Sequence, residues 1–404
     1  MKHRKIRLAI IFDQLLSVGG GYQQALNISI HINKMNSIYT PVFFTIFAQN
    51  VPILKKYGIK VTYIKISKFN RAWLKIRSLI YSEFLLVCIQ SFLGFNKFEK
   101  YLIDENIDLV YFLSPSNWTN YLENLNFIIT IWDLCHRDEL EFPEVYKNRI
   151  FERREIGLIK SLKRAIAVIA DSELGKNNIL KRYMVDKSRV YVAPFLPSFN
   201  ISNPNLNITK NIKEKFNISR DYIFYPAQFW AHKNHIYILK GLKILKEKFS
   251  TNIDVVFAGG DAGNLEYVKN AVNQLNLIDQ THFLGFVNDD DMVGLYRESI
   301  ALVMPSYFGP TNIPPLEAFN LGVPVLYSDL PGLKDQVGDA ALLLNLDNPE
   351  SMANHLLNIL NDKNLRKNLI DKGKKRININ NNNYFEIVSL ICSKFQIKMQ
   401  TWKQ

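Results

Sequence analysis

Along the chain, short continuous apolar runs alternate with longer stretches in which apolar and polar positions recur at helical spacing. The short runs are rich in β-branched and aromatic residues, which is typical of strands buried on both faces. We expect strands at Ile6–Phe12, Val42–Phe47, Leu109–Phe112, Phe127–Ile131, Ala165–Ala170, Arg189–Ala193, Tyr222–Tyr225, Asp254–Ala258, Ala301–Met304 and Val323–Tyr327. Amphipathic helices are expected between them, among others at Glu152–Ser161, Leu174–Tyr183, Ile236–Phe249, Leu265–Leu275 and Met292–Glu298. This alternation predicts an α/β fold in which helices cover both faces of parallel sheets.

The rhythm stops at Pro194–Asn211, where three prolines lie among Asn and Ser residues, as in a linker. The 404 residues suffice for two or three domains at roughly 100–200 residues each. We therefore expect one domain at 1–200 and a second at 201–383. The tail 384–404 predicts a helix that packs back toward the N-terminal domain. The run Asn380–Asn383 just before it predicts a loop.

The segment Ile300–Tyr327 predicts a strand, a loop, a helix and a second strand. Its loop joins the carboxyl end of a buried strand to a helix N-terminus, the place where open α/β sheets bind ligands. Thr311 and Asn312 are candidates for the helix N-cap. Glu317 can accept hydrogen bonds from two vicinal hydroxyls, as on a ribose. Alternatively it only complements the helix dipole, worth about 0.3–1 kcal/mol, and on pattern alone we favour that alternative.

Two other turns join a predicted strand to a predicted helix. Lys233 stands in the aromatic-rich turn FYPAQFWAHKNH, where a cation opposes the helix dipole, so a merely solvated lysine is disfavoured. In the same turn we expect His235 to be an ordinary surface histidine. Gly259 and Gly260 follow a strand and allow close approach of a ligand, although a tight turn alone would explain them.

Three consecutive aspartates, Asp289–Asp291, invite a Mg²⁺ or Mn²⁺ site. They also lie where a helix is expected to begin, and acidic residues stabilise a first helical turn. We therefore predict that Asn288 or Asp289 caps this helix and that no metal binds here.

Composition narrows the choice of partners. The 50 Lys and Arg residues exceed the 37 Asp and Glu residues, a net charge of +13 that fits anionic ligands or an anionic membrane surface. The basic residues are dispersed and form no recognised nucleic-acid module, so we expect no nucleic-acid partner. Three widely separated cysteines indicate a reducing compartment. No window reaches the ~18 uninterrupted apolar residues of a membrane span, so we expect a cytoplasmic protein, either free or peripheral on the inner face of the cytoplasmic membrane.

Residues 71–98 combine basic side chains with many large apolar ones. We favour a helical insertion packed on the first sheet. The alternative is an interfacial helix that dips into an anionic membrane surface.

The segment 300–327 resembles the donor-site signature of the retaining glycosyltransferases of family four, glycosyl transferases group 1. Glu317-Ala318 and the turn Gly322–Val325 match that signature. The resemblance implies two Rossmann-like domains that face each other across a cleft (the GT-B fold), with a metal-independent site. It also implies that Glu317 binds the ribose of the donor. The family's sugar-binding Glu is replaced by Gly309, so the polar loop must contact the sugar, through Gly309, Thr311, Asn312 and Ile313.

The same resemblance extends to the neighbouring turns. It implies that Lys233 binds the donor diphosphate, while the family's Arg is replaced by Gln228 and His232 compensates in part. It places the nucleotide near Gly259 and Gly260, and its base against the backbone of Phe286 and Val287.

In the N-terminal half, the run Ser17–Gly21 follows the first strand and precedes a helix at Tyr22–Ile32. It is not a GxGxxG motif, which disfavours a nicotinamide or flavin cofactor. The resemblance implies that Gly19 and Gly20 face the donor phosphate and the acceptor. The family's active-site His is replaced by Trp132. Asp133 and His136 are therefore the candidates for orienting the acceptor and for catalysis.

Together these features predict a retaining glycosyltransferase that moves a hexose-type sugar from a nucleotide-sugar to a growing glycan, carried on a polyprenyl lipid, in bacterial surface polysaccharide synthesis (O-antigen or capsule). No resident cofactor or metal is expected, because the nucleotide-sugar is a substrate. Two other functions stay open: a sugar-nucleotide epimerase of the same fold, and a non-catalytic scaffold.

Overall fold

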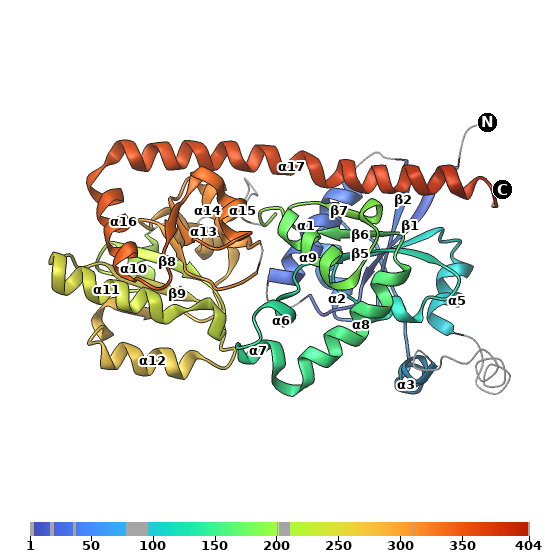
Figure 1. Ribbon diagram of the computed structural model, residues 1–404, viewed down its shortest axis with the longest axis horizontal. Coiled ribbons are helices and arrows are strands. Elements are labelled where there is room, and N and C mark those ends of the chain that lie inside the picture. Colours follow the sequence, from blue (N-terminus) through green and yellow to red (C-terminus); the bar gives the residue numbers. More distant parts are fainter. Residues whose placement is uncertain are drawn as a thin grey trace. The chain divides into compact units, whose positions relative to one another are not determined.

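The computed structural model describes residues 4–16, 20–34, 38–77, 96–199, 201, 211–309 and 311–402 (Figure 1). They form two compact units. The first contains Met1–Leu134, Phe151–Pro194 and Asn383–Gln404, and the second contains Cys135–Ile150 and Phe195–Asn382. Residues Cys135–Ile150 thus group with the second unit, although they precede the expected boundary at residue 200.

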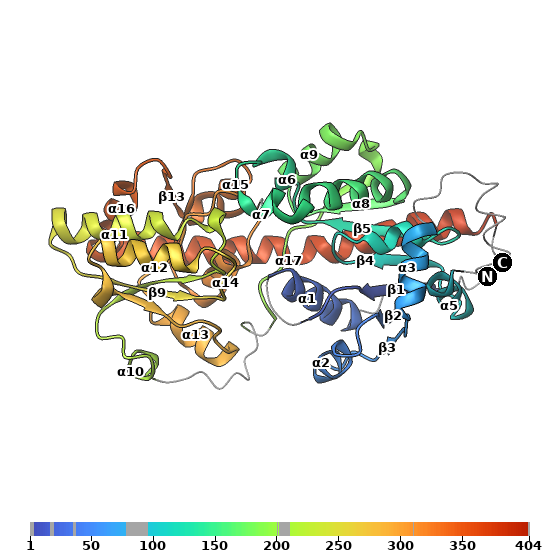
Figure 2. The ribbon, with the colours of Figure 1, turned by 90° about the horizontal axis from the view of Figure 1, so that it is seen from below.

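The first unit is built on a seven-stranded parallel sheet with the order β3-β2-β1-β4-β5-β6-β7. Its strands are β1 (Ile6–Phe12), β2 (Tyr39–Thr45), β3 (Val61–Tyr63), β4 (Leu109–Phe112), β5 (Asn126–Ile131), β6 (Ala167–Ala170) and β7 (Val190–Val192). Its principal helices are α1 (Gly20–Lys34), α2 (Asn50–Lys56), α3 (Lys68–Arg77), α5 (Lys97–Asp104), α8 (Ile150–Arg164) and α9 (Glu173–Tyr183). Figure 2 shows α1 and α2 on one side of this sheet and α8 and α9 on the other.

The second unit is built on a six-stranded parallel sheet with the order β10-β9-β8-β11-β12-β13. Its strands are β8 (Tyr222–Pro226), β9 (Asp254–Ala258), β10 (Thr281–Phe283), β11 (Leu302–Met304), β12 (Val325–Ser328) and β13 (Leu342–Leu344). Its helices include α6 (Cys135–Asp138), α7 (Pro143–Tyr146), α10 (Ile212–Lys215), α11 (His235–Phe249), α12 (Leu265–Gln274), α13 (Asp289–Arg297), α14 (Ile313–Leu321), α15 (Leu333–Val337) and α16 (Glu350–Asn361). In Figure 2, α11, α12 and α16 lie on one side of the sheet and α10 and α13 on the other.

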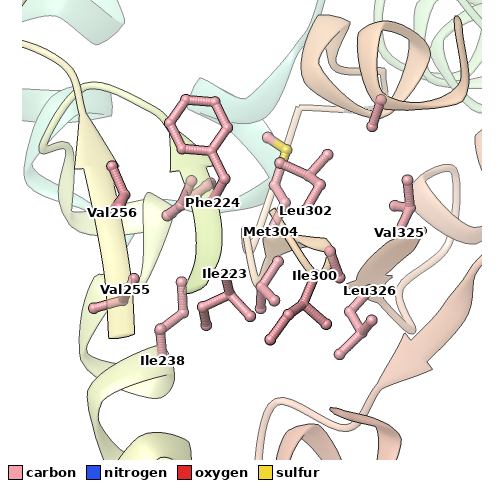
Figure 3. Close-up of a cluster of buried hydrophobic side chains, with 14 of the residues drawn as sticks. Ile223, Phe224, Ile238, Val255, Val256, Ile300, Leu302, Met304, Val325 and Leu326 are labelled. Atoms are coloured by element: carbon pink, nitrogen blue, oxygen red, sulfur yellow. The ribbon is translucent and has the colours of Figure 1, made fainter. Parts of the chain in front are cut away.

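The core of the second unit explains why its strands are continuous apolar runs. Ile223 of β8, Val255 and Val256 of β9 and Leu302 of β11 are all fully buried, and Figure 3 shows their side chains packed together. Neighbouring residues on a strand point to opposite faces of the sheet. A strand that is covered by helices on both faces therefore needs apolar residues at every position, and the predicted α/β class with parallel sheets is confirmed.

The long helix α17 (Lys363–Met399) corrects the expectation for the C-terminal part of the chain. The run Asn380–Asn383, predicted as a loop, lies inside this helix. Asn is unfavourable in a helix by only about 0.7 kcal/mol per residue, which the flanking turns outweigh. Within the first unit, the Tyr384 hydroxyl is hydrogen-bonded to that of Tyr111, and the Gln396 amide donates to the Arg4 carbonyl at 2.9 Å.

Strands β3, β10 and β13, each of three residues, were not expected from the sequence. Most of the insertion expected at 71–98 lies outside the described residues. Among the described helices, none combines the length and the apolar character that crossing a membrane requires.

Candidate functional site

The loops that follow β8, β9, β10 and β11 share the carboxyl edge of the second sheet, because these strands are parallel. Strand β8 lies between β9 and β11 in the sheet. From β8 the chain continues through β9 to β10 at one edge of the sheet, and it then crosses to β11 and continues toward the other edge. This change of direction is a topological switch point, where open α/β sheets bind ligands. The loops after β8 and β11 carry most of the candidate residues of the second unit.

Lys233 ends a short 3₁₀ turn, Ala231–Lys233, after β8. The next residue, Asn234, adopts the left-handed conformation with φ of 52° and redirects the chain into α11. The Lys233 ammonium donates to the Asn312 side-chain oxygen at 2.9 Å, and the Lys233 carbonyl accepts from the Tyr225 hydroxyl at 2.9 Å. These contacts join the loops on the two sides of the switch point.

Asn312 is held by the Gly309 carbonyl and by two side chains that were not expected from the sequence, Tyr327 and Gln336. Its side-chain nitrogen donates to the Tyr327 hydroxyl at 2.6 Å and to the Gly309 carbonyl at 3.1 Å. Its backbone N–H donates to the Gln336 side-chain oxygen at 3.0 Å, and its carbonyl accepts from the Gln336 nitrogen at 2.6 Å. Because the side-chain nitrogen of Asn312 donates to Tyr327 and Gly309, its side-chain oxygen is left to accept from Lys233.

The expected helix start is correct in position and wrong in its capping chemistry. Asn312 is the N-cap residue of α14, with Pro in the first turn and Gly322 as the left-handed C-cap. However, the Asn312 side chain makes no capping hydrogen bond. Instead, its oxygen accepts from Lys233 and its nitrogen donates to Tyr327. Thr311 precedes this position, and Ile313, which is 5% exposed, follows it.

Gly309 occupies the position where the resemblance places a sugar-binding Glu. Its φ is 95°, in the left-handed region that favours glycine. An ideal Cβ here would lie 3.5 Å from the Asn312 side chain, so space is sufficient and the backbone conformation is the obstacle. A Glu at this position would strain the loop.

Glu317 lies in the second turn of α14 and is 5% exposed. Its Oε2 accepts a hydrogen bond from the Tyr296 hydroxyl at 2.8 Å. Burial raises the pKa of Glu317 to about 7, although the Tyr296 hydrogen bond opposes the rise. Because the helix begins at Ile313, a dipole-complementing role in the first turn does not account for this carboxylate. The predicted ribose contact stays a prediction.

The glycine turn after β9 has a packing requirement at one position only. A Cβ on Gly259 would lie 2.2 Å from the Ala227 carbonyl oxygen, whereas one on Gly260 would meet nothing within 4 Å. The Gly259 N–H donates to the Gly285 carbonyl at 2.8 Å, so the turn is tied to the loop after β10. In that loop Phe286 is 79% exposed and Val287 is 7% exposed.

Two other side chains of the turn that carries Lys233 are Gln228, which forms a hydrogen bond within the turn, and His235, which is not on the surface. Gln228, at the family's Arg position, accepts from the Trp230 indole N–H at 3.0 Å. His235 is fully buried and stacks on Phe229 with ring centroids 4.3 Å apart. Burial lowers the pKa of His235 to about 3. The expectation of a surface histidine is therefore wrong, because the turn directs the first residue of α11 into the aromatic core.

The three aspartates at the start of α13 stabilise the helix as predicted. The Asn288 side chain caps it by accepting from the Asp291 N–H at 2.9 Å. Asp291 is nearly buried and forms an ion pair with Lys215 at 2.7 Å. These contacts give Asp291 a structural role in the first turn of α13.

In the first unit, Gly20 begins α1, and Gly19 lies outside the described residues. A Cβ on Gly21 would lie 2.5 Å from the Trp132 ring, so this glycine has a packing role in addition to any ligand role. Asp133 is fixed by Arg154, whose guanidinium contacts the carboxylate at 2.6 Å and the Asp133 carbonyl at 2.9 Å. These contacts suit an orienting carboxylate.

His136 belongs to the second unit, in the short helix α6, and its side chain is buried. Its predicted catalytic role stays a prediction.

Asp13 is a carboxylate that the sequence analysis overlooked. It follows β1, next to β4 at the switch point of the first sheet, and the Ser116 hydroxyl donates to it. Burial raises the pKa of Asp13 to about 6. An acidic residue directly after a buried strand was the available sequence signal.

Comparisons with known proteins concern the sequence of the second unit and the fold of the chain. Residues 208–376 match the family of glycosyl transferases group 1. The chain is 27% identical over 234 residues to the O-antigen chain mannosyltransferase RfbU of Salmonella typhimurium, covering 58% of this chain and 61% of that protein. It is 22% identical over 226 residues to the O-antigen chain mannosyltransferase B of Escherichia coli, covering 56% of this chain and 59% of that protein. The matches thus span about three fifths of these relatives' own length.

A solved structure shows the same fold over the whole chain. The Anabaena protein Alr3699/HepE, crystallised with UDP, matches with a TM-score of 0.68 at 12% identity, covering 98% of this chain and 100% of that one. At this identity the likeness supports the fold, two α/β units of the GT-B type. The segment matched by the family model contains all four loops of the second unit described above. Over residues 208–376, the chain therefore resembles the glycosyl transferases group 1 family.

Proposed function

We propose that this protein is a retaining glycosyltransferase that moves a hexose-type sugar from a nucleotide-sugar to a growing, lipid-linked glycan in the synthesis of a bacterial surface polysaccharide. The observation that carries the proposal is the Lys233–Asn312 contact at the switch point of the second sheet, inside the segment that matches the family. The two relatives named as O-antigen chain mannosyltransferases support the polysaccharide assignment and favour mannose as the first sugar to test.

In this reaction the bond between the sugar C1 and the diphosphate oxygen breaks. The acceptor hydroxyl forms the new C1–O bond on the same face, and its proton passes to the departing diphosphate. Negative charge grows on the diphosphate as the bond breaks. The Lys233 ammonium and the dipole at the N-terminus of α14 are the groups of the second unit that stabilise it.

The other candidate residues recognise the two substrates. Glu317 accepts from the ribose hydroxyls, and the backbone of Phe286 and Val287 contacts the base. The loop from Gly309 to Ile313 contacts the transferred sugar. Asp133, held by Arg154, orients the acceptor.

The acceptor and its location belong to the same proposal. The net charge of +13 favours an anionic acceptor such as a polyprenyl-diphosphate-linked glycan, and a peripheral position on the inner membrane surface. Co-sedimentation with liposomes tests the membrane contact. Equal amounts of protein in the supernatant with neutral and with anionic vesicles would contradict it.

The decisive experiment screens UDP-, GDP- and dTDP-sugars, GDP-mannose among them, by thermal shift and by release of nucleoside diphosphate. A donor at 100 times its Kd should stabilise the protein by about 2.7 kcal/mol. A transferase releases nucleoside diphosphate from the donor. An epimerase converts the donor into a different nucleotide-sugar without releasing nucleoside diphosphate, and a scaffold changes the donor in neither way.

Lys233→Ala is the matched variant for this assay. Removing one preorganised group that stabilises growing charge costs about 2.7–4 kcal/mol, so turnover should fall about 10²–10³-fold. Wild-type turnover in this variant would exclude the assigned role of Lys233.

A further inference from the structure

Glu144, in α7, contacts the turn that carries Lys233, although the two segments are far apart in the sequence. Its Oε1 accepts the backbone N–H of His232 at 2.9 Å, across 88 positions of sequence, and also accepts from His232 Nδ1. The side chains of His232 and Glu144 are 11% and 8% exposed. One nearly buried carboxylate oxygen therefore fixes both the backbone and the ring of the residue before Lys233.

Aromatic packing extends this contact to the loop after β11. The His232 ring stacks on Phe308 with centroids 3.9 Å apart and planes 15° from parallel. Phe142, two residues before Glu144, packs against His232, Tyr307 and Phe308. The Tyr307 N–H donates to the His232 carbonyl at 2.9 Å. The segment around Glu144 thus holds the loops on both sides of the switch point.

The carboxylate is suited to this role at neutral pH. Burial alone would raise the pKa of Glu144, but the hydrogen bonds from His232 outweigh it and hold the pKa below its usual value. An ionised acceptor makes a stronger hydrogen bond to a backbone N–H than a neutral one does. The turn is therefore fixed before any ligand arrives, as effective charge stabilisation requires.

We propose that Glu144 is a positioning residue that holds the Ala231–Lys233 turn so that Lys233 is placed for the diphosphate of the donor. It acts through Lys233 and does not touch the substrate. This inference rests on the proposed function, since it needs Lys233 to bind a diphosphate.

The test combines Glu144→Ala and Glu144→Gln with a double-mutant cycle against Lys233→Ala. Titration calorimetry with GDP, UDP and dTDP measures the affinity for a nucleoside diphosphate. Glu141→Ala is the matched control, because Glu141 is an exposed carboxylate in the same segment. Hydrogen exchange of the peptide that contains the His232 amide reports the order of the turn itself.

We expect Glu144→Ala to weaken nucleoside diphosphate binding about 10- to 100-fold, the loss of one charged hydrogen bond. Glu144→Gln should lose less, because its amide oxygen still accepts the His232 N–H. Exchange at the His232 amide should accelerate in Glu144→Ala, while peptides from the first unit stay unchanged. Glu141→Ala should bind like the wild type.

The cycle separates this inference from the proposed function. If Glu144 acts through Lys233, the Glu144→Ala change has less than a twofold effect in the Lys233→Ala background. Equal effects in both backgrounds, or wild-type binding by Glu144→Ala, would overturn the positioning role alone. A wild-type protein that binds none of the three nucleotides, or a Lys233→Ala variant that binds like the wild type, would overturn the proposed function as well.

Discussion

Replacing Glu317 by Gln should make the protein more stable and less able to bind nucleotide. The carboxylate is buried and its pKa is raised from 4.5 to about 7, whereas a Gln of the same shape can still accept from Tyr296 without carrying a charge. This rise in the pKa corresponds to about 3 kcal/mol against the ionised form in the folded state.

The sign follows from proton linkage. Because the folded state holds this proton more tightly than the unfolded state, the free energy of unfolding falls as the pH rises from 4.5 to 7 and then levels off. The stability gain of Glu317→Gln over the wild type should therefore grow by roughly 2–3 kcal/mol between pH 5 and pH 8.

Urea unfolding of both proteins at several pH values in this window measures the gain. Glu266→Gln removes an exposed carboxylate of α12 and serves as the matched control. Nucleoside binding should at the same time weaken in Glu317→Gln and strengthen with rising pH in the wild type. A stability difference between Glu317→Gln and the wild type that is the same at pH 5 and pH 8 would refute the reasoning.

Two further predictions concern residues whose surroundings the structure defines. Gly259→Ala should destabilise the second unit by about 2–4 kcal/mol, because its Cβ would lie 2.2 Å from the Ala227 carbonyl oxygen. Gly260→Ala is the control and should fold normally, because its Cβ would meet no atom within 4 Å. Urea midpoints of the two variants check this, and equal midpoints would contradict the predicted clash. Glu99→Ala should destabilise the first unit by about 3 kcal/mol or more, because Glu99 accepts the backbone N–H groups of Glu123, Asn124 and Leu125 at 2.6–2.8 Å. Thermal unfolding measures the loss, and a variant as stable as the wild type would show that water replaces the carboxylate.

The sequence by itself determined the class of fold and the elements that carry the site. The run Leu109–Phe112 was placed to the residue, because a strand buried on both faces must be apolar at every position. Lys233 and Asn312 were found from local signals at strand-to-helix turns. Two predictions were wrong, the loop at the Asn-rich run and the surface position of His235. Each was inferred from local composition, without the residues that pack against it in the fold.

Only the tertiary structure decided how these residues meet. Lys233 and Asn312 are 79 positions apart and Glu144 and His232 are 88 apart, so no periodicity or turn motif links them. The partners Tyr327 and Gln336, which orient Asn312, carry no local signal of that role. Burial by the folded chain gives Glu317 its high pKa and His235 its low one. Hydrophobic patterning is a local property of the chain, whereas the positions and charges of a binding site depend on segments that only folding brings together.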